Sequence, residues 1–254
     1  MEVRPGFCIV TENRKEKKMD KVLHRAATRG HADHGWLDTY HTFSFADYYD
    51  PKRIHFGALR VLNDDTVAPG EGFGTHPHAN MEIVSIPLSG ALRHRDSMGY
   101  VQELRPGGIQ VMSAGTGITH SEFNASDTEP VKFLQIWGLP DARGHRPRYD
   151  QLTLAPAVRN ELRPIVAPEG FGNEHVGWIH QRAWFHTLDL DAGRGADYRL
   201  RLFGDGVYLF VLEGCVETAG ETLSRRDGLG ICGAGELRID AAADASVLLI
   251  EVPM

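Results

Sequence analysis

Short apolar segments separated by turn-forming residues recur along the chain, and helical periodicity is scarce. The segments include ALRVLNDD, MEIVSIPLSGALRHRD, GIQVMSAGTG, KFLQIWGLP and ASVLLIEVP, with Gly, Pro, Asn or Asp around them. Many short strands with turn signals at regular spacing are typical of β-sandwiches and barrels. We therefore expect an all-β chain with few, short helices, one of them near Tyr149–Leu152.

Two stretches of the chain match each other in the order of their strands and turns. The first runs from Ile83 to Gly117 and the second from Val207 to Glu236. Each has an apolar strand, a Ser-Gly or Glu-Gly turn, a second strand, a polar hairpin (LRPGG or SRRDG) and an apolar strand ending in AG. A repeat of this kind indicates a duplicated unit, although two hairpins of any β protein can look alike by chance.

The segment Gly138–Leu152 gathers Pro, Gly and charged residues and is the expected boundary between the two copies. We expect a loosely held N-terminal extension at residues 1–18, a first domain at residues 19–145 and a second at residues 146–254. HPH and HSE flank the repeat in the first copy, whereas the second copy has no HxH pair. The first domain is therefore expected to bind a metal, and the second to lack metal ligands.

The composition favours a globular protein and argues against nucleic acid or membrane as a direct partner. Of the 254 residues, 42% are hydrophobic, and the formal net charge is −7. A surface that follows phosphate groups needs a basic field, and RKEKK near the N-terminus is the sole basic block. No apolar run has the length of a signal peptide or a membrane span. Three cysteines without a CxxC pair are typical of a reducing compartment, so we expect a cytoplasmic protein.

Two short segments of the first copy combine histidines with acidic residues. In FGTHPHANMEIV, His76, His78 and Glu82 stand at even spacing, which places side chains on one face of a strand. The same argument places His120 and Glu122 together in ITHSEFN. A lone HxH is usually a polar strand face, but two such segments can bring three imidazoles and one carboxylate together. This set suits a divalent transition metal with open positions, and the spacing leaves open which glutamate takes part.

At these residues the sequence resembles the cupin superfamily, and more closely its pirin branch, including the bacterial quercetinase-like pirins. The matching segments are HGWLDTYHTFSFADYYDP, RVLNDD, GFGTHPHANMEI, RHRDSMG, IQVMSAGTGITHSE and LQIWGLP. The resemblance implies a bicupin, which is two jelly-roll β-sandwich barrels with the metal in the N-terminal one. It also implies that the metal ligands are His76, His78, His120 and Glu122, with Glu82 as a further acidic group of the pocket. Iron is the first metal expected, with Mn, Ni, Co, Cu, Zn or Cd as alternatives.

The activity that the resemblance implies is that of a quercetin 2,3-dioxygenase, which opens a flavonol ring with O2 and releases CO. Its partners would be a small aromatic, flavonol-like substrate and O2, with Glu122 or Glu82 as the general base that takes the flavonol proton. The alternative is a non-enzymatic, metal-binding regulator whose metal redox state controls a protein partner, with the second copy as a docking face. A structural or sugar-binding bicupin without a transition metal is a third hypothesis.

The remaining histidines and large apolar residues of this region are expected to be structural. His41 and His94 could reach the surroundings of the site, but an ordinary polar position is the simpler expectation for each. His31 and His34 are expected to be loop residues. The apolar residues are expected to belong to the core and not to contact a substrate, namely Phe43, Phe45, Phe73, Met81 and Met112.

Overall fold

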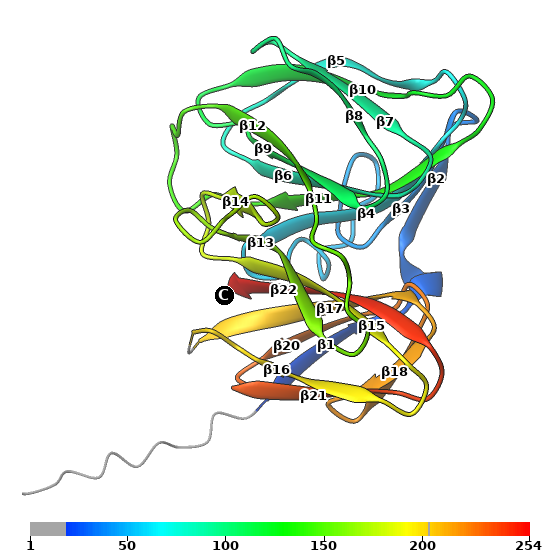
Figure 1. The fold of residues 1–254 in the computed structure, drawn as a ribbon, viewed down its shortest axis with the longest axis vertical. Coiled ribbons are helices and arrows are strands. Elements are labelled where there is room, and N and C mark those ends of the chain that lie inside the picture. Colours follow the sequence, from blue (N-terminus) through cyan, green and yellow to red (C-terminus); the bar gives the residue numbers. More distant parts are fainter. Residues whose placement is uncertain (1–18, 203) are drawn as a thin grey trace, which may run out of the picture.

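The computed structural model describes residues 19–202 and 204–254, which form two β-barrels stacked on each other (Figure 1). The expected N-terminal extension, residues 1–18, lies outside the described residues. Helix in the described part is limited to one 3₁₀ turn, η1 (Ala26–Thr28), and no helix there could span a membrane. The predicted all-β class is confirmed.

The first barrel consists of a seven-stranded sheet that faces a four-stranded sheet. In spatial order, the larger sheet contains β12 (Arg148–Thr153), β9 (Gly108–Ser113), β6 (Glu82–Ser89), β11 (Val131–Gly138), β4 (Leu59–Val67), β3 (Leu37–His41) and β2 (Gly30–Asp33). The smaller sheet contains β5 (Gly72–His78), β10 (Ile118–Asn124), β7 (Leu92–Asp96) and β8 (Val101–Leu104).

The second barrel has the same arrangement. Its larger sheet contains β1 (Asp20–His24), β20 (Gly228–Cys232), β17 (Asp205–Glu213), β22 (Ala245–Pro253), β15 (Trp184–Leu190), β13 (Leu162–Pro168) and β14 (Gly177–Ile179). Its smaller sheet contains β16 (Gly195–Arg199), β21 (Glu236–Ala241), β18 (Cys215–Thr218) and β19 (Glu221–Ser224). The order β20-β17-β22-β15 repeats β9-β6-β11-β4, and β16-β21-β18-β19 repeats β5-β10-β7-β8. This topology confirms the predicted duplication.

The edge strands beside β9 and β20 do not follow the expected division of the chain at residues 145/146. β12 comes after that division but pairs with β9 of the first barrel, whereas β1 comes from the N-terminal half and pairs with β20 of the second. The expectation of a helix near Tyr149–Leu152 is wrong, because these residues lie inside β12. Tyr149 pairs with Met112, and cross-strand pairing of this kind overrides local preference.

The two seven-stranded sheets pack face to face in the middle of the molecule (Figure 1). Val84 and Ile136 of the first barrel belong to the same apolar core as Phe185, Phe210 and Ile250 of the second. Another core fills the interior of the second barrel. The first barrel has two smaller clusters instead, and residues of both line a cavity inside that barrel.

Candidate metal centre

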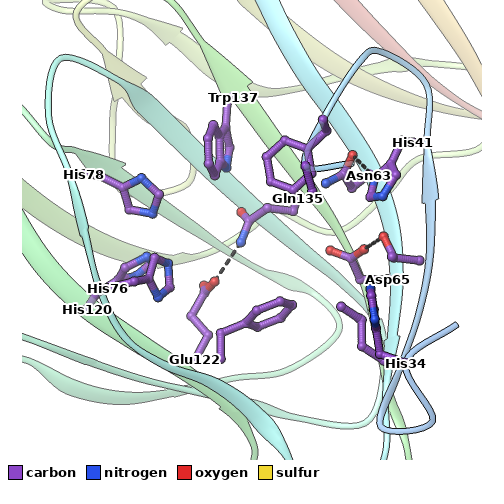
Figure 2. A pocket seen from close by; sticks show the side chains of 15 residues that line it. His34, His41, Asn63, Asp65, His76, His78, His120, Glu122, Gln135 and Trp137 are labelled. Carbon is purple, nitrogen blue, oxygen red and sulfur yellow. Dashed lines mark hydrogen bonds between the residues drawn. The ribbon is translucent and has the colours of Figure 1, made fainter. Parts of the chain in front are cut away.

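Three histidines from neighbouring strands of the smaller sheet face one another (Figure 2). β5 and β10 are antiparallel with His76 opposite His120, and the alternation along β5 keeps His78 on the side of His76. The ring centroids lie 4.8 Å apart for His76–His78, 4.5 Å for His76–His120 and 4.9 Å for His78–His120. One nitrogen from each ring lies within 4.8 Å of the other two. The structure thus brings together the three histidines that the sequence singled out.

The protonation and bonding of these imidazoles suit a cation. His120 is 1% exposed, and neither of its ring nitrogens has a hydrogen-bond partner among the described residues. Burial, with help from neighbouring imidazoles, lowers the pKa of His120 to about 3 and that of His78 to about 4. His76 donates from Nδ1 to the carbonyl of Gly74 at 2.7 Å, which leaves a lone pair on Nε2. Neutral imidazole lone pairs are what a divalent transition metal binds, so the donor set fits such an ion.

Glu122 is the carboxylate that lies beside the histidines. Buried and more exposed residues alternate along β10, which turns His120 and Glu122 toward the barrel interior. The Glu122 carboxylate accepts hydrogen bonds from Gln135 Nε2 at 2.7 Å and Gln110 Nε2 at 3.2 Å. Ser85 Oγ lies 3.3 Å from the carboxylate and donates to Gln135 Oε1 at 3.0 Å. A carboxylate has about four lone-pair sites, so these bonds fix its orientation and leave capacity for a metal.

His94 lies behind His120 and is fully buried. Its ring centroid is 5.4 Å from that of His120, and it stacks on Tyr149 at 4.3 Å. Nε2 donates to Asp96 Oδ2 at 3.0 Å, and Nδ1 has no partner among the described residues. His94, His120 and Glu122 each have one potential ligand atom that lies within 4.8 Å of those of the other two. His94 thus stands next to the predicted ligands, although its sequence context indicated an ordinary polar position.

Glu82 does not line the cavity. The chain leaves β5 after His78, turns at Asn80 with a φ of 51°, and enters β6 in the opposite sheet. The period of two therefore does not continue from His78 to Glu82, and the expectation that Glu82 shares a face with the two histidines is wrong. Instead, Glu82 accepts a hydrogen bond from Ser113 Oγ at 2.6 Å near Arg148, and burial raises its pKa to about 7.

The histidines open into a cavity of about 270 Å³ inside the first barrel. Phe45, Phe73 and Trp137 form aromatic walls, and the Trp137 ring meets His78 edge-on at 4.8 Å. Small-molecule sites are typically apolar cavities of this kind with a few placed polar groups. His41 also lines the cavity, so neither it nor the two phenylalanines is purely structural.

Further polar residues of the cavity were missed by the sequence analysis. Asn63 and Asp65 come from β4 and Gln135 comes from β11, whereas His34, expected to be a loop residue, follows β2 and lines the cavity as well. The alternation of the segment RVLNDD offered a signal, since Asn63 and Asp65 share a strand face. The sequence does not tell which face of β4 is the inner one.

The second barrel does not repeat this centre. β16 and β21 take the places of β5 and β10, but their buried residues Tyr198, Leu237 and Ile239 belong to the apolar core that fills the barrel. Within its described residues, no group of three ligand-type side chains converges. The absence of an HxH pair in the second copy is in line with this packed interior.

The fold and the site define a bicupin with one candidate metal centre, in its N-terminal barrel. The family model described as pirin matches residues 22–138, and the one described as quercetinase C-terminal cupin domain matches residues 165–252. A quercetin 2,3-dioxygenase of Escherichia coli (strain K12) is 41% identical over 231 residues, which are 91% of this chain and 98% of that protein. The chain belongs to the pirin family.

Two further relatives extend the comparison. A protein of Mycobacterium bovis is 53% identical over 233 residues, which are 91% of this chain and 94% of that protein. The crystal structure of a bacterial pirin from Escherichia coli in complex with nickel(II) has a TM-score of 0.86 and 40% identity. That comparison covers 92% of this chain and 99% of the other. A homologous fold therefore binds a divalent transition metal, as the donor set here would.

Proposed function

We propose that the protein is a metal-dependent dioxygenase that opens flavonol rings with O2 and releases CO. One observation carries the proposal, namely three converging imidazoles and a carboxylate that open into a cavity with aromatic walls. The Escherichia coli relative that bears the name quercetin 2,3-dioxygenase supports the choice of substrate class. The reaction adds both atoms of O2 to the ring-opened product and expels one ring carbon as CO.

His76, His78, His120 and Glu122 would hold the metal, for which we propose iron. When bound, a divalent ion would supply Lewis acidity toward a flavonol hydroxyl and redox chemistry toward O2. The nickel complex of the related bacterial pirin supports a divalent ion at this place.

The other residues of the cavity position the substrate and keep out water. Phe45, Phe73 and Trp137 offer flat apolar surfaces against which an aromatic ring system can pack. Gln135 and Gln110 donate hydrogen bonds to Glu122 and hold it in place. Because those bonds occupy much of its acceptor capacity, Glu122 is better suited to binding the ion than to taking a proton. The placement of Glu82 outside the cavity leaves it without contact to a ligand there.

The regulator hypothesis rested on the second copy as a docking face. The larger sheet of that copy packs against the first barrel in a shared apolar core. This arrangement favours a structural task for the second copy, and the enzyme hypothesis remains the better supported one.

The proposal is tested with metal-free protein that is reloaded in turn with iron(II), nickel(II) or manganese(II). Quercetin and O2 are added, and the flavonol absorbance and released CO are followed. We expect turnover with at least one metal and none with His76→Ala. The control is His31→Ala, because His31 is exposed and pairs with Asp38 outside the cavity. Absence of CO with every metal would refute the proposal.

A further inference from the structure

Asp65 is a buried carboxyl group inside the cavity that the proposed metal centre does not use. It lies on β4, is 4% exposed and lines the cavity. Thr39 donates a short hydrogen bond to Oδ1, and no hydrogen bond to Oδ2 is found in the described part of the chain. No ion pair among the described residues involves Asp65, although it lies beside the ion-paired Asp64.

The two neighbouring aspartates point to opposite faces of β4. Asp64 faces the second barrel, with Arg226 of that barrel at 2.7 Å and Arg29, which lies between η1 and β2, at 3.4 Å. Asp65 faces the interior of the first barrel, where none of the described cationic side chains forms an ion pair with it. Ionised groups in protein interiors are normally paired, because an unpaired buried charge is costly. Asp65 is therefore an exception that the fold itself does not explain.

Asp65 lies at the side of the cavity opposite the three histidines (Figure 2). His41 and Asn63 line the same side, and their side chains are hydrogen-bonded to each other at 3.0 Å. The cavity thus has an imidazole end, aromatic walls and a polar end. A flat ligand that reaches from one end to the other would place its far substituents beside Asp65.

We propose that Asp65 accepts a hydrogen bond from a phenolic hydroxyl on the part of the substrate remote from the imidazoles, and so makes the site selective for polyhydroxylated flavonols. The inference rests on the proposed function, since it takes a flavonol as the ligand. A ligand hydroxyl would supply the partner that Oδ2 lacks. Burial, together with the nearby acids Asp64, Glu122 and Asp38, raises the pKa of Asp65 to about 7, so the carboxylate becomes available near neutral pH.

The test compares binding of quercetin with binding of 3-hydroxyflavone, which keeps the metal-side hydroxyl and lacks the remote ones. Nickel-loaded protein is titrated without O2 at about pH 8, where Asp65 is ionised. Quenching of tryptophan fluorescence reports binding, because Trp137 lines the cavity. The variants are Asp65→Asn, which keeps an acceptor for Thr39, and Asp65→Leu, which removes it. Asp64→Asn is the matched control on the opposite face.

A hydrogen bond to a charged group is typically worth about ten- to a hundredfold in affinity. We therefore expect wild-type protein and Asp64→Asn to bind quercetin at least about tenfold more tightly than 3-hydroxyflavone. The preference should shrink in Asp65→Asn and fall to about threefold or less in Asp65→Leu. A wild-type protein without the preference would overturn the inference even if no variant folded. An unchanged preference in folded Asp65 variants would overturn it equally.

The outcome is separable from that of the proposed function. A preference that depends on Asp65, in a protein that releases no CO under O2, would keep this binding role and remove the dioxygenase. If wild-type protein and Asp65→Leu both turned over quercetin and 3-hydroxyflavone, and neither protein differed in kcat/KM between the two flavonols, the dioxygenase function would stand and the role of Asp65 would be refuted.

Discussion

Replacing Glu82 with glutamine should stabilise the protein increasingly as pH rises and leave its metal content unchanged. Glu82 is 1% exposed, and burial raises its pKa from 4.5 to about 7. At about 1.4 kcal/mol per unit of pKa difference, this shift corresponds to about 3.5 kcal/mol at full ionisation. The folded protein binds the proton more tightly than the unfolded chain, so wild-type stability falls as pH rises from about 4.5 through about 7. Glutamine does not ionise and avoids that loss.

The assay is urea unfolding of both proteins, in the same metal state, at about pH 5 and about pH 8. The free energy of unfolding of Glu82→Gln relative to wild type should rise by about 2 to 3 kcal/mol between the two pH values. Ser113 can still donate to the amide oxygen, so its hydrogen bond is retained. Nickel binding should be unaffected, whereas Glu122→Gln should weaken it. A stability difference independent of pH, or loss of nickel from Glu82→Gln, would refute the reasoning.

Three further predictions concern the metal centre and a turn near it. His120→Ala should weaken nickel binding, measured by calorimetry, by more than about a hundredfold. Losing a residue that only hydrogen-bonds to a metal ligand already costs about 10- to 100-fold in affinity, and His120 would be a ligand itself. The control His31→Ala should leave nickel binding unchanged. The pKa values of His78 and His120 are about 4 and about 3, so both imidazoles are already neutral near pH 7. Nickel binding at that pH should therefore release fewer protons than binding to three free imidazoles would. Calorimetry in buffers of different ionisation enthalpy measures the number of protons released. Gly115→Ala should lower the free energy of unfolding by about 2 kcal/mol or more in urea titrations, because Gly115 has a φ of +49° and a Cβ there would collide with the carbonyl of His145.

Local patterns predicted those parts of the structure that depend on one strand at a time. The alternation along β10 placed His120 and Glu122 on one face, and the structure has them so. The repeated order of strands and turns predicted the duplication, because each copy folds its own pair of hairpins. The glycine and proline punctuation was sufficient for the all-β class.

Features that depend on which sheet a strand joins were beyond these patterns. The period-two argument failed at Glu82 because the chain changes sheets between β5 and β6. Tyr149 lies in a strand because β9 offers an unpaired edge, and β1 pairs with β20 far along the chain. Asp64 and Asp65 look alike in sequence, yet one pairs with arginines and the other lines the cavity.

The contrast between the two barrels explains how one fold can hold an open site and still be stable. A cavity forgoes the apolar burial and close contacts that a filled interior would supply. In the first barrel, the interior beside the histidines is a cavity with aromatic walls and several polar side chains. The second barrel fills the corresponding space with Tyr198, Leu237 and Ile239, and the shared core adds burial between the larger sheets. The second copy thus adds buried apolar surface, and its described residues form no comparable group of metal-type ligands. The exchanged edge strands β1 and β12 tie each barrel to residues from the other half of the chain.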